Sequence, residues 1–466
     1  MKFTKYLTLS NRKVIIIGFG SIGPAALLLI LRHIDINPAE IEIISDSLKN
    51  QDIAENHGVK FSHFKLMPEN YKKYLVSKLT QDDILINLSV EISSIDLIKL
   101  CQEMGVLYLD TSNEAWPSNI TGVRTGTYER RQKMQQETNH FSTGVTALVC
   151  HGANPGLITH FAKQAVLDVG NSIKNIESVP QSANEWANIA QASDIVSLHI
   201  SERDTQASSI KRIVDEYVNT WSIEGLFEEA SENVGFAWGT HEEELPREMV
   251  KNRIDGEKCR IIELNQLGVE TQINSWVPSK GMFTGFLMPH VEAYSIAELF
   301  SRKVLDNRYQ PTVHFVYHPC WDAIDSMRHA MAQGWVNINH KRLLGDDILE
   351  GKDELGILVV RKHSPDIYWF GSRLDIKEAR SLIPHNNATS VQVAVGILSG
   401  LVWIIENPQC GIVEPEQVDF KRVLEIAAPY LGEFGGHWAK WPEEHFPKMT
   451  GHALKQHFYN SSKEVT

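Results

Sequence analysis

His290 and Glu292 are the pair of side chains in this sequence best suited to moving a proton near neutral pH. An imidazole titrates close to neutrality, and a neighbouring carboxylate raises its pKa and orients its ring. If the stretch 289–295 is extended, positions 290 and 292 share a face, so both side chains would enter one cavity. The alternative is a surface or capping pair, and the residue types alone leave both interpretations open.

A second set of residues, around Trp221, is suited to binding a positively charged amine. An indole face attracts an ammonium group through a cation–π interaction, and carboxylates add charge-assisted hydrogen bonds. The acidic residues near Trp221 in the sequence are Asp215, Glu216, Glu224, Glu228 and Glu229. The alternative is a core tryptophan beside a solvated acidic helix, which is the commoner role of both residue types.

These side chains need a scaffold and a reaction partner, and the N-terminal segment indicates both. A β-branched run at 14–17 leads into Gly-x-Gly-x-x-Gly at 18–23, and a helix-like run with proline in its first turn follows at 24–32. Strand, glycine loop and helix together form the dinucleotide-binding fingerprint, in which the glycines allow a tight turn and close approach of the pyrophosphate to the helix N-terminus. The predicted cofactor-binding residues of this loop are Gly18, Gly20, Ser21, Ile22 and Gly23.

Asp46 indicates which dinucleotide binds. It ends a predicted second strand, 41–46, roughly 20 residues after the glycines, where an acidic side chain contacts the ribose hydroxyls. A carboxylate there repels a 2′-phosphate, so the sequence favours NAD over NADP, although Lys49 close by argues mildly the other way. The alternative is a solvated aspartate after a strand.

Two further predicted strands, 83–88 and 105–110, continue the β/α alternation around a predicted helix at 95–104. In an open α/β sheet, ligands bind beyond the carboxyl ends of the strands. We expect the polar residues there to line the cofactor crevice, and we assign both glutamates among them to the substrate. These residues are Ser89, Glu91, Asp110, Thr111 and Glu114.

Asn154 follows the last predicted strand of this half, 146–150. An Asn-Pro-Gly sequence is most often only a turn. We nevertheless expect this one at the crossover between two domains, where the nicotinamide ring reaches. Its amide could orient either the cofactor or the substrate.

Composition places the chain among cytoplasmic globular enzymes. At 466 residues it is too long for one ordinary core, and its net charge of −13 argues against nucleic acid as a partner. The five cysteines are scattered and form no Cys-x-x-Cys pair, which excludes a disulfide framework and a cysteine-rich zinc site. No metal-ligand motif is present, so we expect no catalytic metal.

The apolar stretch 14–31 follows several cationic residues and could be taken for a signal peptide or membrane anchor. Three glycines and a proline interrupt it, and no other segment approaches about 18 uninterrupted apolar residues. We therefore expect a soluble, non-exported protein without a membrane partner.

Several longer strings resemble the bacterial homospermidine synthase family, a relative of the saccharopine dehydrogenase-like enzymes. The resemblance covers nearly the whole chain, and the strings that carry it lie at residues 18–24, 87–90, 108–111, 151–156, 202–206, 289–294 and 387–390. The resemblance implies that two putrescine molecules become homospermidine and ammonia, with NAD as a recycled hydride carrier. Glu91 stands where relatives are expected to carry aspartate, which keeps the charge but alters the reach.

The resemblance also implies roles for individual residues. Trp221 would pack beside a cationic intermediate, and Glu202 and Glu229 would hold substrate ammonium groups. Asn154, His290 and Glu292 would line the reaction centre.

The expected architecture is an α/β protein with two main domains: a Rossmann NAD-binding domain over 1–150 and an α+β catalytic and dimerisation domain over 151–385. By analogy with the saccharopine dehydrogenase-like fold, an apolar helix at about 386–406 returns to the first domain. Residues 407–466 would form a helical or irregular segment packed on the body. A homodimer is expected.

Two other functions stay open at this point. A NAD(P)-dependent saccharopine or carboxyspermidine dehydrogenase would bind substrate carboxylates, so its pocket should present arginine or lysine. The marked segments offer mostly glutamate, tryptophan and histidine, which favours a diamine. A non-catalytic NAD-sensing protein is opposed only by the density of polar residues at the expected crevice.

Overall fold

The computed structural model describes residues 4–117, 126–176, 178–242, 249–256, 259–302, 308–335 and 340–441. The chain divides into two compact units. Unit 1 comprises residues 1–125, 129–157 and 379–430, and unit 2 comprises 126–128, 158–378 and 431–466. Each unit is therefore assembled from segments that are far apart in the sequence.

Unit 1 contains a seven-stranded sheet in which every pairing is parallel. Its strands are β2 (Val14–Ile17), β4 (Ile41–Ser45), β5 (Lys60–His63), β6 (Ile84–Asn87), β7 (Leu107–Asp110), β8 (Ala147–Leu148) and β22 (Ile412–Val413). The strand order is β22-β8-β7-β6-β2-β4-β5. From β2 the chain adds strands β4 and β5 on one side and then strands β6, β7 and β8 on the other, so the order of addition reverses between β2 and β6. This reversal is the switch point at which Rossmann folds bind dinucleotides.

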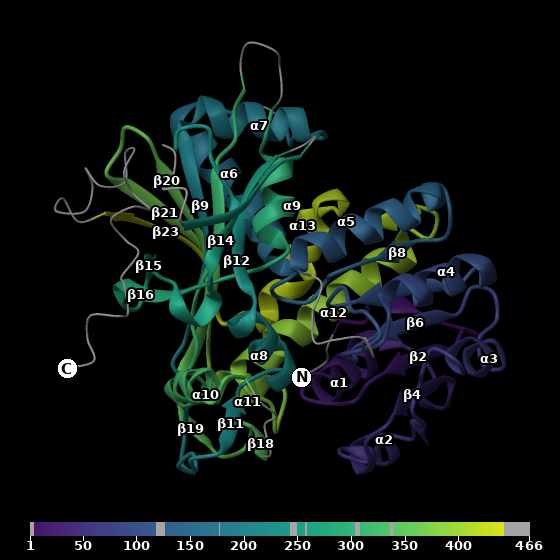
Figure 1. Cartoon of the computed structure of the whole chain (residues 1–466). Coiled ribbons are helices and arrows are strands. Elements are labelled where there is room, and N and C mark those ends of the chain that lie inside the picture. Colours follow the sequence, from purple (N-terminus) through teal and green to yellow (C-terminus); the bar gives the residue numbers. More distant parts are fainter. Residues whose placement is uncertain are drawn as a thin grey trace. The chain divides into compact units, whose positions relative to one another are not determined.

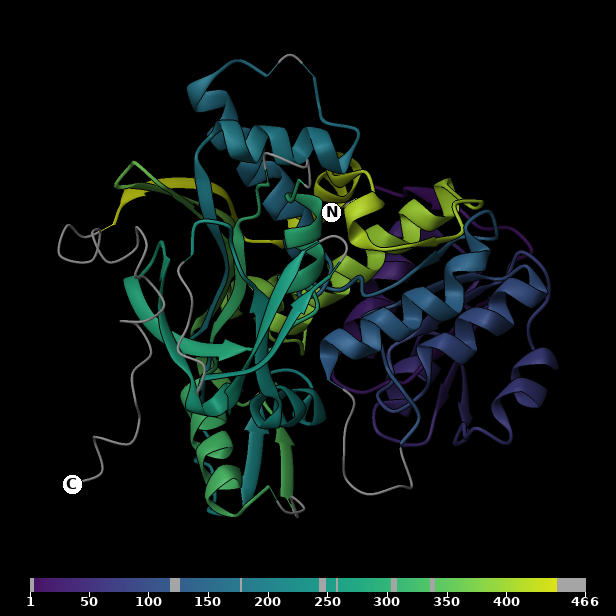
Figure 2. The same cartoon turned by 45° about the horizontal axis from the view of Figure 1, so that its top comes forward.

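Helices complete unit 1. They are α1 (Gly23–His33), α2 (Gln51–Asn56), α3 (Tyr71–Val76), α4 (Ser94–Met104), α5 (Thr127–Thr138), α12 (Ala388–Glu406) and α13 (Phe420–Ala427), of which α5 begins in unit 2. A small parallel pair is formed by β1 (Leu7–Thr8) and β3 (Ile34–Asp35). In Figures 1 and 2, α12 and α13 (yellow-green) lie beside the purple and blue segments of this unit, and α12 packs against α1. The apolar return helix thus contributes to the core of unit 1.

Among the described residues, α12 alone is long and apolar enough to cross a membrane. The share of its most apolar window that is buried inside the protein is 89%. Burial of this kind is typical of a core helix.

Unit 2 is organised around a ten-stranded mixed sheet. Its strands are β9 (Ile195–Asp204), β12 (Asn233–Ala237), β13 (Val250–Asp255), β14 (Arg260–Leu267), β15 (Gln272–Val277), β16 (Gly281–Met288), β17 (Thr312–His318), β20 (Lys352–Arg361), β21 (Asp366–Asp375) and β23 (Glu433–Lys440). Strand β9 is central, parallel to β17 and antiparallel to β20. Its ten residues are almost all buried, so the polar ones among them must find partners.

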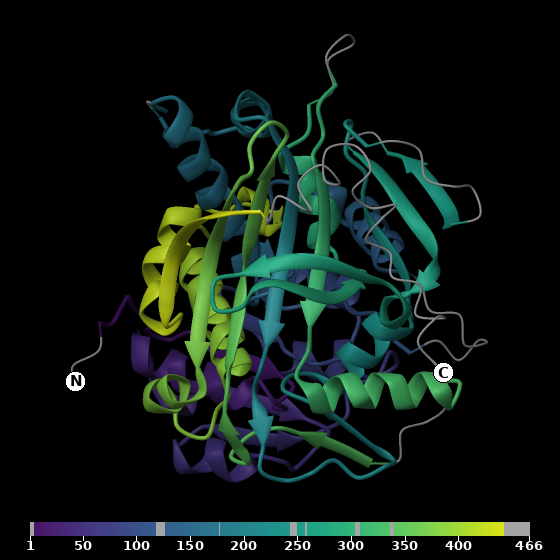
Figure 3. The same ribbon diagram turned by 90° about the vertical axis from the view of Figure 1, so that its left-hand side faces the viewer.

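Alternation along β9 separates two faces of this sheet. On one face, Ser201 donates to the Trp276 carbonyl and His199 contacts the Ser275 hydroxyl, because the β15–β16 hairpin crosses there. Figure 3 shows this hairpin running across the sheet. The opposite face carries Glu202 and Asp204, and the candidate reaction residues lie on it.

Among the described residues, unit 2 also contains two small sheets and six α-helices. The small sheets pair β10 (Ala207–Ser208) with β19 (Ile348–Glu350) and β11 (Glu216–Asn219) with β18 (His340–Leu343). The helices are α6 (Leu157–Ile173), α7 (Ala183–Ala192), α8 (Ile223–Ser231), α9 (Glu292–Leu299), α10 (Trp321–Ala332) and α11 (Ile376–Leu382), of which α6 and α11 begin or end in unit 1.

The fold class expected from the sequence is confirmed, while the C-terminal segment differs from expectation. Residues 407–466 were expected to form one helical or irregular segment, but α13 belongs to unit 1 and β23 pairs with β21 in unit 2. The glycine pair in β23 lowers its apparent strand propensity, which explains why the strand escaped the sequence pattern. Residues 442–466 lie outside the described residues.

Candidate functional site

The glycine loop of unit 1 has the geometry that a dinucleotide requires. Gly18 has φ +84°, and a Cβ there would lie 2.9 Å from the backbone of Leu88, so a side chain is excluded twice. Gly20 is exposed, and a Cβ there would meet nothing within 4 Å. Gly23 begins α1, with Pro24 in its first turn. The loop therefore leaves open space beside a helix N-terminus, where a pyrophosphate fits.

Asn50 holds this loop in place, a role that the sequence did not reveal. Its side-chain amide donates to the carbonyls of Phe19 and Gly20, each at 3.1 Å. Asp46 directly follows β4 and is exposed, as a carboxylate that receives ribose hydroxyls must be. The residues present fit NAD.

The polar residues beyond β6 and β7 fall into a partly exposed and a buried set. Ser89 donates to Asn87 at 2.5 Å. Exposed Glu91 has φ +64°, and its backbone N–H donates to the Glu114 carboxylate at 3.2 Å, which places both acids together. The two acids assigned to the substrate are thus neighbours at one sheet edge.

Asp110 is fully buried and accepts hydrogen bonds from the Tyr108 hydroxyl and the Cys150 backbone, at 2.8 and 2.6 Å. Burial raises the pKa of its carboxyl to about 7, against the lowering effect of these donors. Its visible role is to hold the turn at Cys150, where φ is +56°. Direct contact between Asp110 and the cofactor stays a prediction.

The loop that carries Asn154 is clamped against α12. The imidazole of His151 contacts the Gly396 carbonyl at 3.0 Å, and a Cβ on Gly396 would lie 2.1 Å from the carbonyl oxygen of Gly152. Thr111 also approaches this loop, since its methyl group would lie 3.5 Å from a Cβ on Gly152. Two glycines, Gly152 and Gly396, therefore bring the loop and the helix into backbone contact. This contact fixes the position of the loop from which the Asn154 side chain extends.

In unit 2, His290 and Glu292 form the pair that their types suggest, although the expected local structure was wrong. The imidazole Nδ1 lies 2.9 Å from a Glu292 carboxylate oxygen, and both side chains are buried. The segment is not extended, because Glu292 is the first residue of α9. The helix start, rather than strand alternation, turns the carboxylate back toward the ring.

The electrostatic surroundings of His290 favour its protonated form. Burial lowers its pKa, but the adjacent Glu292 carboxylate and the further charges of Glu229 and Glu232 outweigh burial and raise it. Glu232 itself accepts from the Thr127 backbone and hydroxyl at 2.6 and 2.9 Å. His290 can therefore accept a proton and keep it as a stabilised imidazolium.

Trp221 is joined to Glu202 through Tyr317. The indole Nε1–H donates to the Tyr317 hydroxyl at 3.1 Å, and Tyr317 stands directly beside Glu202 in the parallel pair of β17 and β9. Phe315 stacks on Tyr317 at 5.5 Å and meets the His290 ring edge-on at 5.0 Å. These contacts connect Trp221, Glu202 and the His290 pair into one aromatic and acidic surface.

Two further buried acids adjoin this surface. Asp204 lies two residues after Glu202 on the same face, and Asp353 is its neighbour in β20. Burial raises the pKa of the Asp204 carboxyl, although the Gln206 backbone and the Thr220 hydroxyl donate to it at 2.8 and 2.7 Å. The carboxyl groups of Asp204 and Asp353 beside Glu202 are suited to binding a cation.

Most acids near Trp221 in the sequence are engaged elsewhere. Asp215 lies 3.3 Å from His329, Glu216 binds Arg342 at 2.8 Å, and Glu224 binds Lys341 at 2.8 Å. Glu229 instead acts on the His290 ring. This electrostatic effect indicates that Glu229 lies near the candidate reaction centre.

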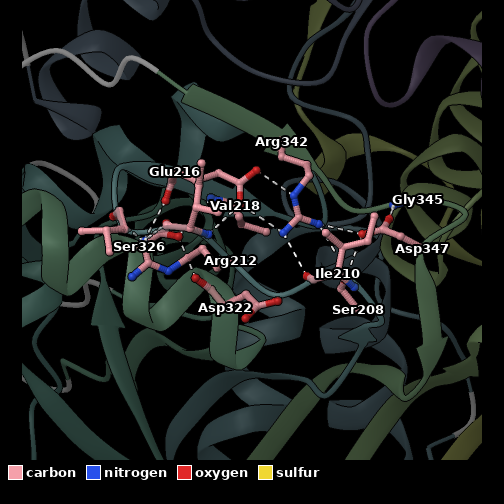
Figure 4. Close-up of polar contacts among 12 residues, drawn as sticks. Ser208, Ile210, Arg212, Glu216, Val218, Asp322, Ser326, Arg342, Gly345 and Asp347 are labelled. Atoms are coloured by element: carbon pink, nitrogen blue, oxygen red, sulfur yellow. Dashed lines mark hydrogen bonds and ion pairs between the residues drawn. The ribbon is translucent and has the colours of Figure 1, made fainter.

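The Glu216–Arg342 pair positions the strand that leads to Trp221. Figure 4 shows the Arg342 guanidinium bridging Glu216 and Asp347, while the Ser326 hydroxyl accepts from the Val218 backbone at 2.9 Å. β11 is thereby attached to β18 and α10 on both sides. Trp221 follows two residues after this anchored strand.

Sequence reasoning missed Tyr317, Phe315, Asp204 and Asp353. Asp204 lies in the marked string 202–206, but no role was assigned to it there. Nothing near Tyr317, Phe315 or Asp353 in the sequence distinguishes them, because the registers of β9 with β17 and β20 bring them to the site. In the part of the chain that the structure describes, no group of three His, Cys, Asp or Glu side chains is placed to hold a metal ion.

Family models and curated proteins that match this chain agree with one another. Residues 14–148 match the family model of the saccharopine dehydrogenase NADP binding domain, and residues 152–439 match that of the saccharopine dehydrogenase C-terminal domain. The chain is 35% identical over 441 residues to a homospermidine synthase of Mesorhizobium japonicum, covering 92% of this chain and 90% of that protein. It is 36% identical over 439 residues to a homospermidine synthase of Blastochloris viridis, covering 92% and 91%.

Solved structures agree. The crystal structure of the homospermidine synthase of Legionella pneumophila in complex with NAD is similar with a TM-score of 0.87 and 38% identity, covering 94% of this chain and 93% of that one. The saccharopine dehydrogenase of Saccharomyces cerevisiae shares the fold, with a TM-score of 0.51 and 9% identity over 93% and 100% of the two chains.

Proposed function

The chain belongs to the bacterial homospermidine synthase family, and we propose that it converts two molecules of putrescine into homospermidine and ammonia with the residues described above. The observation that carries this assignment is the acidic and aromatic surface formed by Trp221, Tyr317 and Glu202 beside the His290–Glu292 pair. Such a surface stabilises a cation and repels a carboxylate.

His290 acts on the proton that the substrate must lose. An alkylammonium group titrates near 10, as lysine does, and it has no lone pair until it is deprotonated. The raised pKa of His290 makes the ring a better acceptor, and Glu292 stabilises the imidazolium that results. NAD, which the glycine loop and Asp46 would hold, would supply a hydride acceptor and later return the hydride.

Trp221, Glu202 and Glu229 act on the positive charge. Loss of hydride from the amine carbon leaves a cationic carbon–nitrogen double bond, which carboxylates and an indole face stabilise electrostatically. The second amine adds to that carbon, ammonia leaves, and the new double bond receives the hydride. The buried surroundings of His290 and Tyr317 limit access of water, which would hydrolyse the imine to an aldehyde.

The remaining polar residues receive narrower roles in this proposal. Glu91 and Glu114, held together at one sheet edge, bind a substrate ammonium group, and Asn154 orients substrate or nicotinamide. Ser89, Asp110 and Thr111 complete the cofactor crevice of unit 1. We also propose a cytoplasmic homodimer, supported by five free cysteines and by the prevalence of symmetric dimers.

A dehydrogenase for saccharopine or carboxyspermidine is the alternative function. Its carboxylate-bearing substrate would need a cation where Glu202 stands, but neighbouring Arg203 points to the opposite face, 3.8 Å from Glu354. Incubation of the purified protein with putrescine and NAD separates these functions. Homospermidine without net NADH supports the proposal, lasting NADH supports the dehydrogenase, and no turnover supports a non-catalytic protein. Size-exclusion chromatography with light scattering tests the dimer.

A further inference from the structure

We propose that Tyr317 is a positioning residue that orients the Trp221 indole toward the cationic intermediate. This inference rests on the proposed function of Trp221 and adds to it the residue through which the indole is held. The indole has one polar group, Nε1–H, and this group donates to the Tyr317 hydroxyl at 3.1 Å. A single hydrogen bond at the ring edge restrains rotation of the ring plane.

Tyr317 is itself rigidly placed. Its side chain is 1% exposed, and its ring stacks on Phe315 at 5.5 Å. Its backbone is paired with Glu202 on β9 and with Phe286 on β16, so the residue is held from both sides of its strand. The hydroxyl is therefore a fixed acceptor rather than a mobile one.

Gly225 restrains the indole at its other edge. A Cβ on Gly225 would lie 2.5 Å from Cζ3 of Trp221, so the ring packs directly on the first turn of α8. That turn is capped by Ser222, whose hydroxyl accepts from the Gly225 backbone at 2.9 Å. The helix thus holds the six-membered ring of the Trp221 indole, and Tyr317 holds the N–H edge of the same indole.

The chemistry of the hydroxyl suits this role. Burial raises the pKa of Tyr317, and the carboxylates of Glu202, Asp204 and Asp353 raise it further, so the phenol stays neutral. A neutral hydroxyl accepts the indole N–H through a lone pair and keeps its own proton for a neighbouring acceptor. Donation from Nε1–H also draws electron density into the π system, which strengthens its attraction for a cation.

A double-mutant cycle tests the inference, with Tyr317→Phe, Trp221→Phe and the double variant. Phenylalanine keeps the stacking of Tyr317 and keeps a π face at position 221, but each substitution removes one partner of the hydrogen bond. Steady-state homospermidine formation gives kcat and KM for putrescine, and NAD binding is measured separately. Tyr309→Phe is the matched control, because the Tyr309 hydroxyl donates to the Ile195 carbonyl in the same unit at 2.7 Å.

Tyr317→Phe should lower kcat about tenfold, with little change in NAD affinity. The double variant should be no slower than Trp221→Phe alone, because the hydroxyl then has no indole N–H to hold. Tyr309→Phe should lower the unfolding temperature and leave kcat unchanged. Multiplying effects in the double variant, or an equal kcat loss in Tyr309→Phe, would overturn the role of Tyr317. Normal kcat in Trp221→Phe and Trp221→Ala would instead contradict the proposed function of Trp221.

Discussion

Replacing Glu292 by glutamine should lower the pKa of His290 and move the acidic limb of the activity profile to lower pH. The two side chains approach to 2.9 Å, and at an effective dielectric constant of about 20 two opposite charges at that distance attract by about 6 kcal/mol. Desolvation of the buried pair offsets much of this attraction. Because the charges of Glu229 and Glu232 remain, we expect the pKa of His290 to fall in Glu292→Gln but to stay partly supported by these two carboxylates.

The assay is the pH dependence of kcat/KM for putrescine, followed by homospermidine formation. The limb that reports loss of the imidazole proton should move to lower pH, while maximal kcat falls because the ring is a weaker base and its imidazolium has lost its partner. Glu354→Gln is the control, since Glu354 is also buried but lies on the opposite face, where it accepts from Ser279 at 3.1 Å.

Stability gives an independent check with a defined sign. The pKa of His290 is raised in the folded state, so its contribution to stability is present below the unfolded pKa of about 6.5 and is lost as the pH rises through the folded value. The stability gap between the wild type and Glu292→Gln should therefore be larger in acid than in alkali. An acidic limb that stays in place in Glu292→Gln, or moves equally in Glu354→Gln, would refute the reasoning.

Three further outcomes are expected. Trp221→Ala should reduce turnover by at least about 100-fold and leave NAD affinity unchanged, as measured by calorimetry; unchanged turnover would remove the cation–π role. Gly18→Ala should weaken NAD binding at least about tenfold and lower the unfolding temperature, because its Cβ would lie 2.9 Å from backbone at φ +84°; wild-type affinity would contradict this. Burial lowers the pKa of His314 to about 4, against the raising effect of Glu242, so stability should be complete above about pH 6.5 and fall toward pH 4. His314→Leu should flatten this dependence in urea titrations, and an unaltered slope would assign the acid sensitivity to other groups.

Local sequence patterns were sufficient to predict the strand, glycine loop and helix of the nucleotide-binding half. The run 14–17 is fully buried, and the glycines after it meet the needs that their spacing predicts: Gly18 has a positive φ and a close backbone approach, and Gly20 has free space beside it. A glycine loop is encoded locally, because backbone sterics and helix ends act over a few residues. Asn50 was missed because it reaches the loop from the position just before α2, about 30 residues on.

Local sequence patterns could not predict which side chains of the second half meet in the site. The adjacency of His290 and Glu292 was foreseen for a wrong reason, since a helix start rather than a strand joins them. Of the acids that surround Trp221 in the sequence, Asp215, Glu216 and Glu224 have cationic or histidine partners elsewhere. Proximity in sequence overstated their part in the site.

The sequence by itself determined the Rossmann half and the chemical groups available, and it favoured a diamine as substrate. The tertiary structure decided which groups meet. Tyr317 comes beside Glu202 through the pairing of two strands more than 100 residues apart, and Trp221 is joined to Tyr317 by a side-chain hydrogen bond. Strand register depends on burial across the whole sheet, so no local pattern encodes it.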